Sequence, residues 1–229
     1  ADGVIDKSAF LETRSPKQPS NQLLTVSHDK YLQLCKALKS KVEMSGDAKS
    51  SRDLVLVQIL GECGLKASEA SNLCWGDIWP ELDSSSNDSI VGCLRVKGEN
   101  ERLIPFSQDL SYSLELLKEA RKKLDLSVGL EAKLFFGYLN VSRRTRTDFL
   151  HRHGIKFVIY EVCNEFLNVP YNSESLRNHA ILRWISQGLD NEKVAHLAGY
   201  SSLNSLERFL RCSDVKKLGK RKKKRALVS

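Results

Sequence analysis

Two basic runs carry the side chains best suited to binding phosphate groups. Arginine and hydroxyl residues are interleaved in Ser142-Arg143-Arg144-Thr145-Arg146-Thr147, and the last fourteen residues hold eight Lys or Arg and no Asp or Glu. Cationic and hydroxyl side chains make most protein contacts with DNA phosphates. Both runs therefore predict contact with double-stranded DNA, through Arg143, Arg144, Arg146, Lys220, Arg221, Lys222, Lys223, Lys224 and Arg225.

The net charge of +8 resides in the C-terminal tail. The sequence holds 36 Lys and Arg against 28 Asp and Glu, so without the eight tail cations the two signs balance at 28 each. A block of like charge repels itself and is typical of a nucleic-acid arm or a nuclear-address signal. A solubilising tail and a solvated charged face at 142–147 are the alternatives. The neutral body weakens the case for DNA, because DNA-binding domains are usually basic overall.

Cysteine and histidine spacing gives no indication of a metal site or a cofactor. The sequence contains no Cys-x-x-Cys pair, and its cysteines stand at 35, 63, 74, 93, 163 and 212. No run of about 18 apolar residues is present to span a bilayer, and the N-terminus lacks the pattern of a signal peptide. We expect a soluble protein with no metal, cofactor or membrane partner. We expect it in the cytoplasm, associated with the nucleoid, or in the nucleus if the source is a eukaryote. Because the chain begins at Ala1 rather than Met, a longer natural chain is a further expectation.

Hydrophobic periodicity predicts a mainly helical chain with a small antiparallel sheet. We expect a lead-in segment over residues 1–24, one domain over 25–212 and the basic tail over 213–229. A buried helix is expected from Asp53 toward Gly64, after a loop at 44–51, and the apolar runs 90–96 and 102–106 predict a hairpin. Further helices are predicted at 27–40, 67–73, after Ser107, and at 143–153, 155–168, 174–187, 191–198 and 202–211.

Three segments, in order along the chain, resemble the catalytic domain of tyrosine recombinases, which include phage integrases and Xer-type site-specific recombinases. Gly-Leu-Lys-Ala-Ser-Glu at 64–69 and Leu-Cys-Trp-Gly-Asp-Ile at 73–78 are similar to the family's Gly-Leu-Arg-x-x-Glu and Leu-x-Trp-x-Asp-Ile motifs. Val-Lys-Gly at 96–98, with Arg-Leu-Ile-Pro at 102–105, resembles the hairpin that carries its active-site lysine. The stretch from Leu176 to Phe209 matches the C-terminal half. The resemblance covers roughly residues 22–212 and implies the family's fold.

The resemblance also implies a reaction, in which a tyrosine hydroxyl attacks a DNA phosphate and forms a covalent link. Two arginines and histidine-type donors stabilise the charge on the phosphate oxygens, and a lysine protonates the leaving oxygen. Carried over by position, the lysine is retained as Lys97 and the second arginine as Arg177. Four positions differ: the first arginine is Lys66, the first histidine Glu174, the second histidine Tyr200 and the nucleophile Phe209.

These four changes predict a protein that cannot perform the family reaction. Phe209 has no oxygen with which to attack. Lys66 keeps the charge of an arginine but loses its two-pronged phosphate geometry. A carboxylate such as that of Glu174, about 4 Å from a phosphate, is repelled by about 4 kcal/mol at an effective dielectric constant of about 20.

Side-chain neighbours suggest alternative roles for several of these residues. Glu174 and Arg177 are one helical turn apart, which predicts an internal ion pair between them. With Lys66 they are expected to form a closed polar cluster. His179 is interpreted as a packed helix histidine. Tyr200 either packs over a neighbouring helix or acts as a displaced nucleophile.

Three functional hypotheses follow. The first is a catalytically inactive DNA-binding protein, regulatory or architectural, which would use Lys97 and Arg102 in addition to the two basic runs. The second is an active recombinase, or a trapped mutant if Phe209 is engineered; the changes at 66, 174 and 200 favour a natural Phe209. The third is a protein-interaction module that has lost DNA binding, which the acidic loop 79–89 favours. The resemblance also implies self-association through the C-terminal segment.

Overall fold

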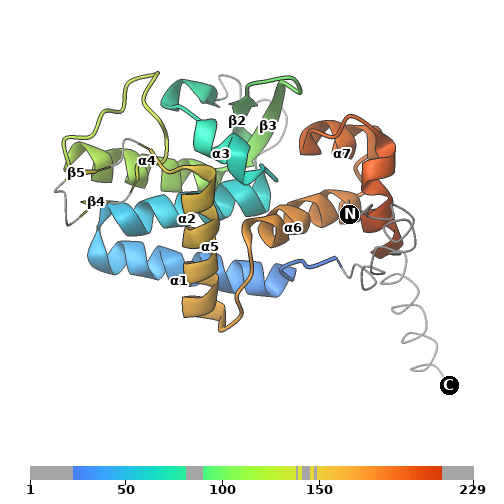
Figure 1. Ribbon diagram of the computed structural model, residues 1–229, viewed down its shortest axis with the longest axis horizontal. Coiled ribbons are helices and arrows are strands. Elements are labelled where there is room, and N and C mark those ends of the chain that lie inside the picture. The colour runs from blue at the N-terminus through green and yellow to red at the C-terminus, as the bar shows by residue number, and fades with distance from the viewer. Residues whose placement is uncertain (1–22, 81–89, 138, 141–144, 147–148, 213–229) are drawn as a thin grey trace, which may run out of the picture.

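Helix α2 (Ala48–Glu62) forms the centre of the molecule, which the computed structural model describes over residues 23–80, 90–137, 139–140, 145–146 and 149–212. It packs against α1 (His28–Ser45), α4 (Gln108–Lys122) and α6 (Ser173–Ser186), and α5 (Arg152–Leu167) also contacts it (Figure 1). Nearly every side chain of α2 is buried, because other elements surround it. The predicted fold class, mainly α with a small antiparallel sheet, is confirmed.

The loop predicted over 44–51 is wrong, because α1 and α2 are joined by only two residues. Gly46 ends α1 with a φ of 59°, and Asp47 caps α2 by accepting from the backbone N–H of Ser50. The polar start of α2 has the composition of a loop, yet Ser50 and Arg52 are buried. Side-chain capping, which a periodicity pattern does not report, explains the difference.

A three-stranded antiparallel sheet lies beside α3 (Ala67–Asn72), as Figure 1 shows. The predicted hairpin is confirmed as β2 (Ile90–Val96) and β3 (Arg102–Ser107). A third strand, β1 (Ile78–Pro80), pairs with β2 and was not predicted, because three residues are too few to show an alternating pattern. The sheet brings the loop 97–101 to the same side of the molecule as α3.

The helix predicted over 143–153 is wrong in the part that the structure describes. Leu139–Asn140 (β4) pairs with Thr145–Arg146 (β5), and α5 begins only at Arg152. Arg146 therefore lies in a strand and not at a helix N-terminus. The run 142–147 has no apolar positions at helical spacing, and β-branched Thr145 suits a strand. Arg143 and Arg144 lie outside the described residues.

The C-terminal third is helical, as predicted, over the residues that the structure describes. Helix α6 is followed by α7 (Asn191–Ala198), which Asp190 caps and Gly199 ends with a φ of 64°. The helix predicted over 202–211 starts as a 3₁₀ turn, η3 (Leu203–Leu206), and continues as an α-helix over 207–212. Among the described residues, no helix is long and apolar enough to cross a membrane.

Candidate functional site

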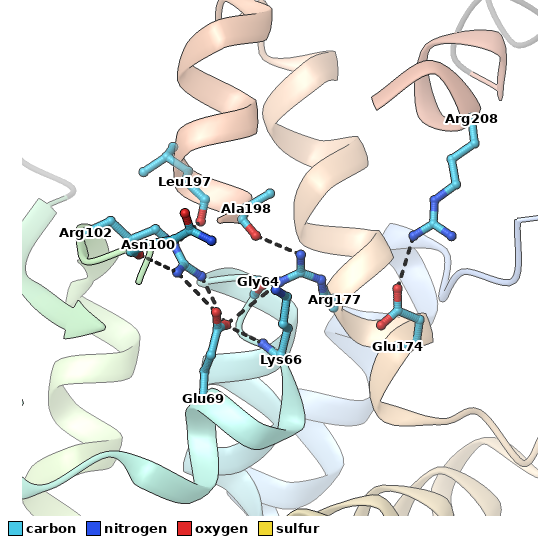
Figure 2. A network of polar contacts seen from close by, with 10 residues as sticks. All are labelled: Gly64, Lys66, Glu69, Asn100, Arg102, Glu174, Arg177, Leu197, Ala198 and Arg208. Atoms are coloured by element: carbon cyan, nitrogen blue, oxygen red, sulfur yellow. Dashed lines mark hydrogen bonds and ion pairs between the residues drawn. The ribbon is translucent and has the colours of Figure 1, made fainter. Parts of the chain in front are cut away.

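Arg177 is buried at the point where α6 meets α7 and the turn before α3 (Figure 2). Its Nη1 donates to the carbonyl of Gly64 at 2.6 Å, and its Nη2 donates to the carbonyl of Ala198 at 2.7 Å. The ring of Tyr200 lies 5.2 Å from the guanidinium carbon. Two of the donor groups that a phosphate would need are thus used to hold two backbone segments together.

Arg102 and Glu69 form the second half of this cluster. Nη1 and Nη2 of Arg102 donate to the two carboxylate oxygens of Glu69 at 3.1 and 3.0 Å, and Nε donates to the carbonyl of Leu197 at 2.9 Å. A Cβ atom at Gly199, whose φ is +64°, would lie 2.6 Å from Nη1 of Arg102, so a side chain there would displace the guanidinium group from this position. The side chain of Arg102 is 1% exposed, a position that does not suit the DNA contact predicted for it.

Glu69 ends the motif at residues 64–69, but no role in this cluster was predicted for it. Its carboxylate also accepts from the backbone N–H of Lys66 at 2.7 Å, and Nη1 of Arg177 lies 4.0 Å away. The i to i+3 spacing from Lys66 to Glu69 is half of a capping box and is the sequence signal that points to it. A strand that buries Arg102, Ile104 and Phe106 on one face is the signal for the inward position of Arg102.

The predicted ion pair between Glu174 and Arg177 is wrong. Glu174 instead accepts from Nη2 of Arg208 at 3.2 Å, with both side chains about half exposed (Figure 2). Spacing on a helix brings two side chains near each other but does not fix their rotamers, and Arg177 turns toward buried carbonyls. The closed cluster of Lys66, Glu174 and Arg177 is therefore not formed, because Lys66 and Glu174 are exposed.

Phe209 and Tyr200 pack against each other, and the ring of Tyr200 also lies against Arg177. Phe209 is 0% exposed, and its ring centre lies 6.4 Å from that of Tyr200. The hydroxyl of Tyr200 is buried and has no hydrogen-bond partner among the described residues. Both rings thus contribute to the core, and the ring at position 209 is closed to solvent.

Lys97 lies on the loop between β2 and β3 and is turned toward η2 (Trp75–Asp77). Its Nζ is 2.8 Å from Oδ1 of Asp77, a buried residue, while the lysine side chain itself is about half exposed. The hydrogen bond and the negative charge of Asp77 raise the pKa of Lys97 above its ordinary value. Lys97 therefore stays protonated and is held by a partner within the chain.

His179 is a strongly perturbed titratable group near the site. It is buried on α6, with Nδ1 2.8 Å from the carbonyl of Gly61 and Nε2 3.3 Å from Nδ1 of His28. Burial, with smaller contributions from Arg183 and His28, lowers the pKa of His179 to about 4. The described residues include no group of three or more His, Cys, Asp or Glu arranged to hold a metal ion.

The sequence profile of the phage integrase family matches residues 25–215. The chain belongs to the phage integrase family. Tyrosine recombinase XerD of Proteus mirabilis is similar to it at 28% identity over 206 residues, which cover 88% of this chain and 58% of that protein. Tyrosine recombinase XerC of Oceanobacillus iheyensis is 29% identical over 160 residues, covering 68% and 48%. The chain thus spans about half to three fifths of the length of these two curated relatives.

Solved structures of the phage integrase family share the fold. XerA recombinase superimposes with a TM-score of 0.60 at 19% identity, over 86% of this chain and 61% of that one. XerH site-specific recombinase, solved as a pre-cleavage complex with its difH substrate, gives 0.61 at 16% identity, over 84% and 52%. A lambda integrase dimer bound to a COC′ core site gives 0.53 at 14%, over 90% and 65%.

Proposed function

We propose that this member of the phage integrase family binds double-stranded DNA and neither cuts nor joins it. The observation that carries the proposal is Phe209, which stands where the family resemblance implies the nucleophile. It has no oxygen, and its ring is fully buried. Because a phosphotyrosyl link cannot form without a hydroxyl at that position, the family reaction stops before its first step.

The buried arginines support the same proposal. A phosphate that entered the pocket would have to compete with Gly64, Ala198 and Glu69 for the donors of Arg102 and Arg177. Releasing those donors would leave buried acceptors without partners, which costs free energy. We infer that Lys66, Lys97, Glu174, Arg177, Tyr200 and Phe209 occupy the family's six active-site positions and that this set no longer forms a phosphate-binding pocket.

The first prediction is that no covalent protein–DNA adduct forms. Wild type and Phe209→Tyr, each incubated with a nicked suicide duplex, should both give no slow-migrating band in a denaturing gel. The single variant restores a hydroxyl but leaves Lys66 and Glu174 in place and the donors of Arg177 occupied. An active tyrosine recombinase on its own nicked site is the positive control. A phosphotyrosyl adduct in Phe209→Tyr would show that the pocket still binds phosphate.

Apart from Lys97 on the β2–β3 hairpin, contact with DNA is assigned to surfaces outside the old pocket. Arg152 and His153 are exposed in the first turn of α5, a helix of 16 residues whose N-cap, His151, makes no side-chain cap bond. Free backbone N–H groups and the positive end of the helix dipole suit phosphate oxygens there. The basic runs at 142–147 and 216–225, most of whose residues lie outside the part of the chain that the structure describes, are proposed as further phosphate contacts.

The second prediction concerns the tail. Deleting residues 214–229 should weaken binding to duplex DNA and flatten its salt dependence by about 0.9 in log–log slope for each phosphate that the protein no longer neutralises. The melting temperature should stay near that of the full chain, which checks that the body remains folded. An unchanged slope would assign the phosphate-binding residues to another part of the chain. Absence of any salt-dependent gel shift in the full chain would favour the protein-interaction hypothesis.

We also propose a regulatory or architectural role and a location on the nucleoid. We propose that the chain is divided into a lead-in segment (1–24), one domain (25–212) and a tail (213–229). Finally, we propose that the protein self-associates through its C-terminal segment. Sedimentation of the full chain over a range of concentrations, compared with the 214–229 deletion, tests this last point. Association that persists after the deletion would exclude the tail as its cause.

A further inference from the structure

Lys97 makes its ion pair beyond the C-terminal end of α3, whereas Lys66 and Glu69 lie at the start of that helix. The lysine stem runs beside a hollow of about 100 Å³, whose lining side chains come from α3, η2 and β2. These lining residues are Ser68, Glu69, Asn72, Leu73, Asp77, Val96 and Lys97. The side chain thus lines this hollow, and its ammonium group contacts Asp77.

Asp77 is a strong partner for this lysine because it is buried. Its residue is 2% exposed, and its Oδ2 accepts from the backbone N–H of Cys74 at 3.0 Å. Within the described residues, the pair with Lys97 is the one polar contact of Oδ1. A buried carboxylate without a counter-ion is costly, whereas the half-exposed lysine can be solvated by water. Breaking the ion pair therefore costs free energy mainly because it leaves the Asp77 carboxylate buried and unpaired.

The residue after Lys97 is a glycine, Gly98, which can adopt backbone conformations that other residues rarely adopt. Its φ is +125°, and a Cβ added at Gly98 would meet no atom within 4 Å. Arg95 of β2 and Glu101 of the loop form a separate ion pair at 2.8 Å, in which Lys97 takes no part. Release of Lys97 from Asp77 would therefore leave this pair intact.

We propose that Asp77 is a positioning residue that holds Lys97 against η2 and competes with a DNA phosphate for its ammonium group. This inference rests on the proposed function, because the competitor is DNA. Under this proposal, Lys97 can bind a DNA phosphate only when its ion pair with Asp77 breaks. The β2–β3 hairpin therefore contributes less to DNA affinity than its charge alone suggests.

The test is Asp77→Asn, because asparagine keeps an oxygen that can accept from Cys74 while removing the charge that holds Lys97. DNA binding should tighten by about five-fold, the range expected for releasing a partly exposed ion pair. The salt dependence should steepen by about 0.9 in log–log slope, for one additional phosphate neutralised. Lys97→Ala in the Asp77→Asn background should abolish both effects.

The matched control is Glu101→Gln, which removes one negative charge from the same hairpin, releases Arg95 instead of Lys97, and leaves the Lys97–Asp77 pair intact. Binding that tightens as much in Glu101→Gln as in Asp77→Asn would show that loss of any negative charge from this hairpin is sufficient and that release of Lys97 in particular is not responsible. Tighter binding that survives Lys97→Ala would overturn the proposal in the same way.

A measurement without DNA separates this proposal from the proposed function. Reductive methylation of Lys97, followed by mass spectrometry, should be about five-fold faster in Asp77→Asn, because the amine loses the partner that favours its protonated form. Glu101→Gln should react at the wild-type rate. Faster methylation in Asp77→Asn, with no DNA binding by any variant, would show that Asp77 restrains Lys97 but that DNA does not compete for it. An unchanged methylation rate would show that Asp77 does not restrain Lys97 and would overturn the proposal.

Discussion

Arg177→Ala is expected to lower the free energy of unfolding by about 4 kcal/mol, because it removes two charge-assisted hydrogen bonds to buried carbonyls. The acceptors are the carbonyls of Gly64 and Ala198, which would each be deprived of the guanidinium donor. The loss should appear as a melting temperature lower by about 10 °C, and as a lower midpoint in urea. Affinity for duplex DNA, measured under conditions where the variant is folded, should change little.

Arg208→Ala is the matched control for this prediction. It also removes an arginine near the site, but its bond to Glu174 joins two side chains that are about half exposed. Breaking such a surface pair should cost less than about 1 kcal/mol. If Arg177→Ala were instead as stable as the wild type and did not bind DNA, the guanidinium would be a phosphate ligand and its internal bonds would be secondary.

The elements that the sequence predicts well are those with long or repeated patterns. Helix α2 and the β2–β3 hairpin follow directly from their apolar residues, because burial selects apolar side chains at fixed spacing. Short elements leave no such trace, which is why β1 and the β4–β5 pair were missed. The helix predicted at 143–153 begins in the run 142–147, which has no apolar residues to set a period, and charged and hydroxyl residues alone do not distinguish a helix start from a strand.

The sequence predicts where the residues of the candidate site lie along the chain, but it does not predict which residues they contact. The motifs give the order of Lys66, Lys97 and Arg177 along the chain, since each lies in a recognisable segment. The partners of Arg177 come from residues 113 and 21 positions away in the sequence. Only the packing of three helical segments brings such carbonyls to one guanidinium, so local spacing suggested the nearer but incorrect partner, Glu174.

The same limit applies to charge. Arg102 counts as a basic residue on a hairpin and for that reason was predicted to contact DNA. Its strand alternates buried and exposed residues, and Arg102 falls in phase with the buried ones. A buried arginine needs paired acceptors, and Glu69 supplies two of them. Alternation is thus a better guide to the role of a strand arginine than its charge.

The second large effect is expected from His179 when the pH falls. In the folded protein the pKa of His179 is about 4, because burial disfavours the charged ring. In the unfolded chain the ordinary value of about 6.5 applies, so the unfolded state binds more protons between these two values. The contribution of His179 to stability is complete above pH 6.5 and is lost as the pH falls toward 4. The loss between pH 7 and pH 4 should be about 3 kcal/mol.

His179→Gln tests this, because an amide can donate to the carbonyl of Gly61 and does not titrate. Urea unfolding of both proteins at several pH values should show the variant losing about 3 kcal/mol less than the wild type between pH 7 and pH 4. Asp53 and Glu62 have pKa values raised by burial, so they act in the opposite direction, but they are present in both proteins and cancel in the difference. His153→Gln, which changes an exposed histidine, should follow the wild-type profile. If His179→Gln and the wild type lose stability in parallel, the ring of His179 accepts a proton without unfolding, and the stack it forms with Tyr31 must open to solvent in the native state.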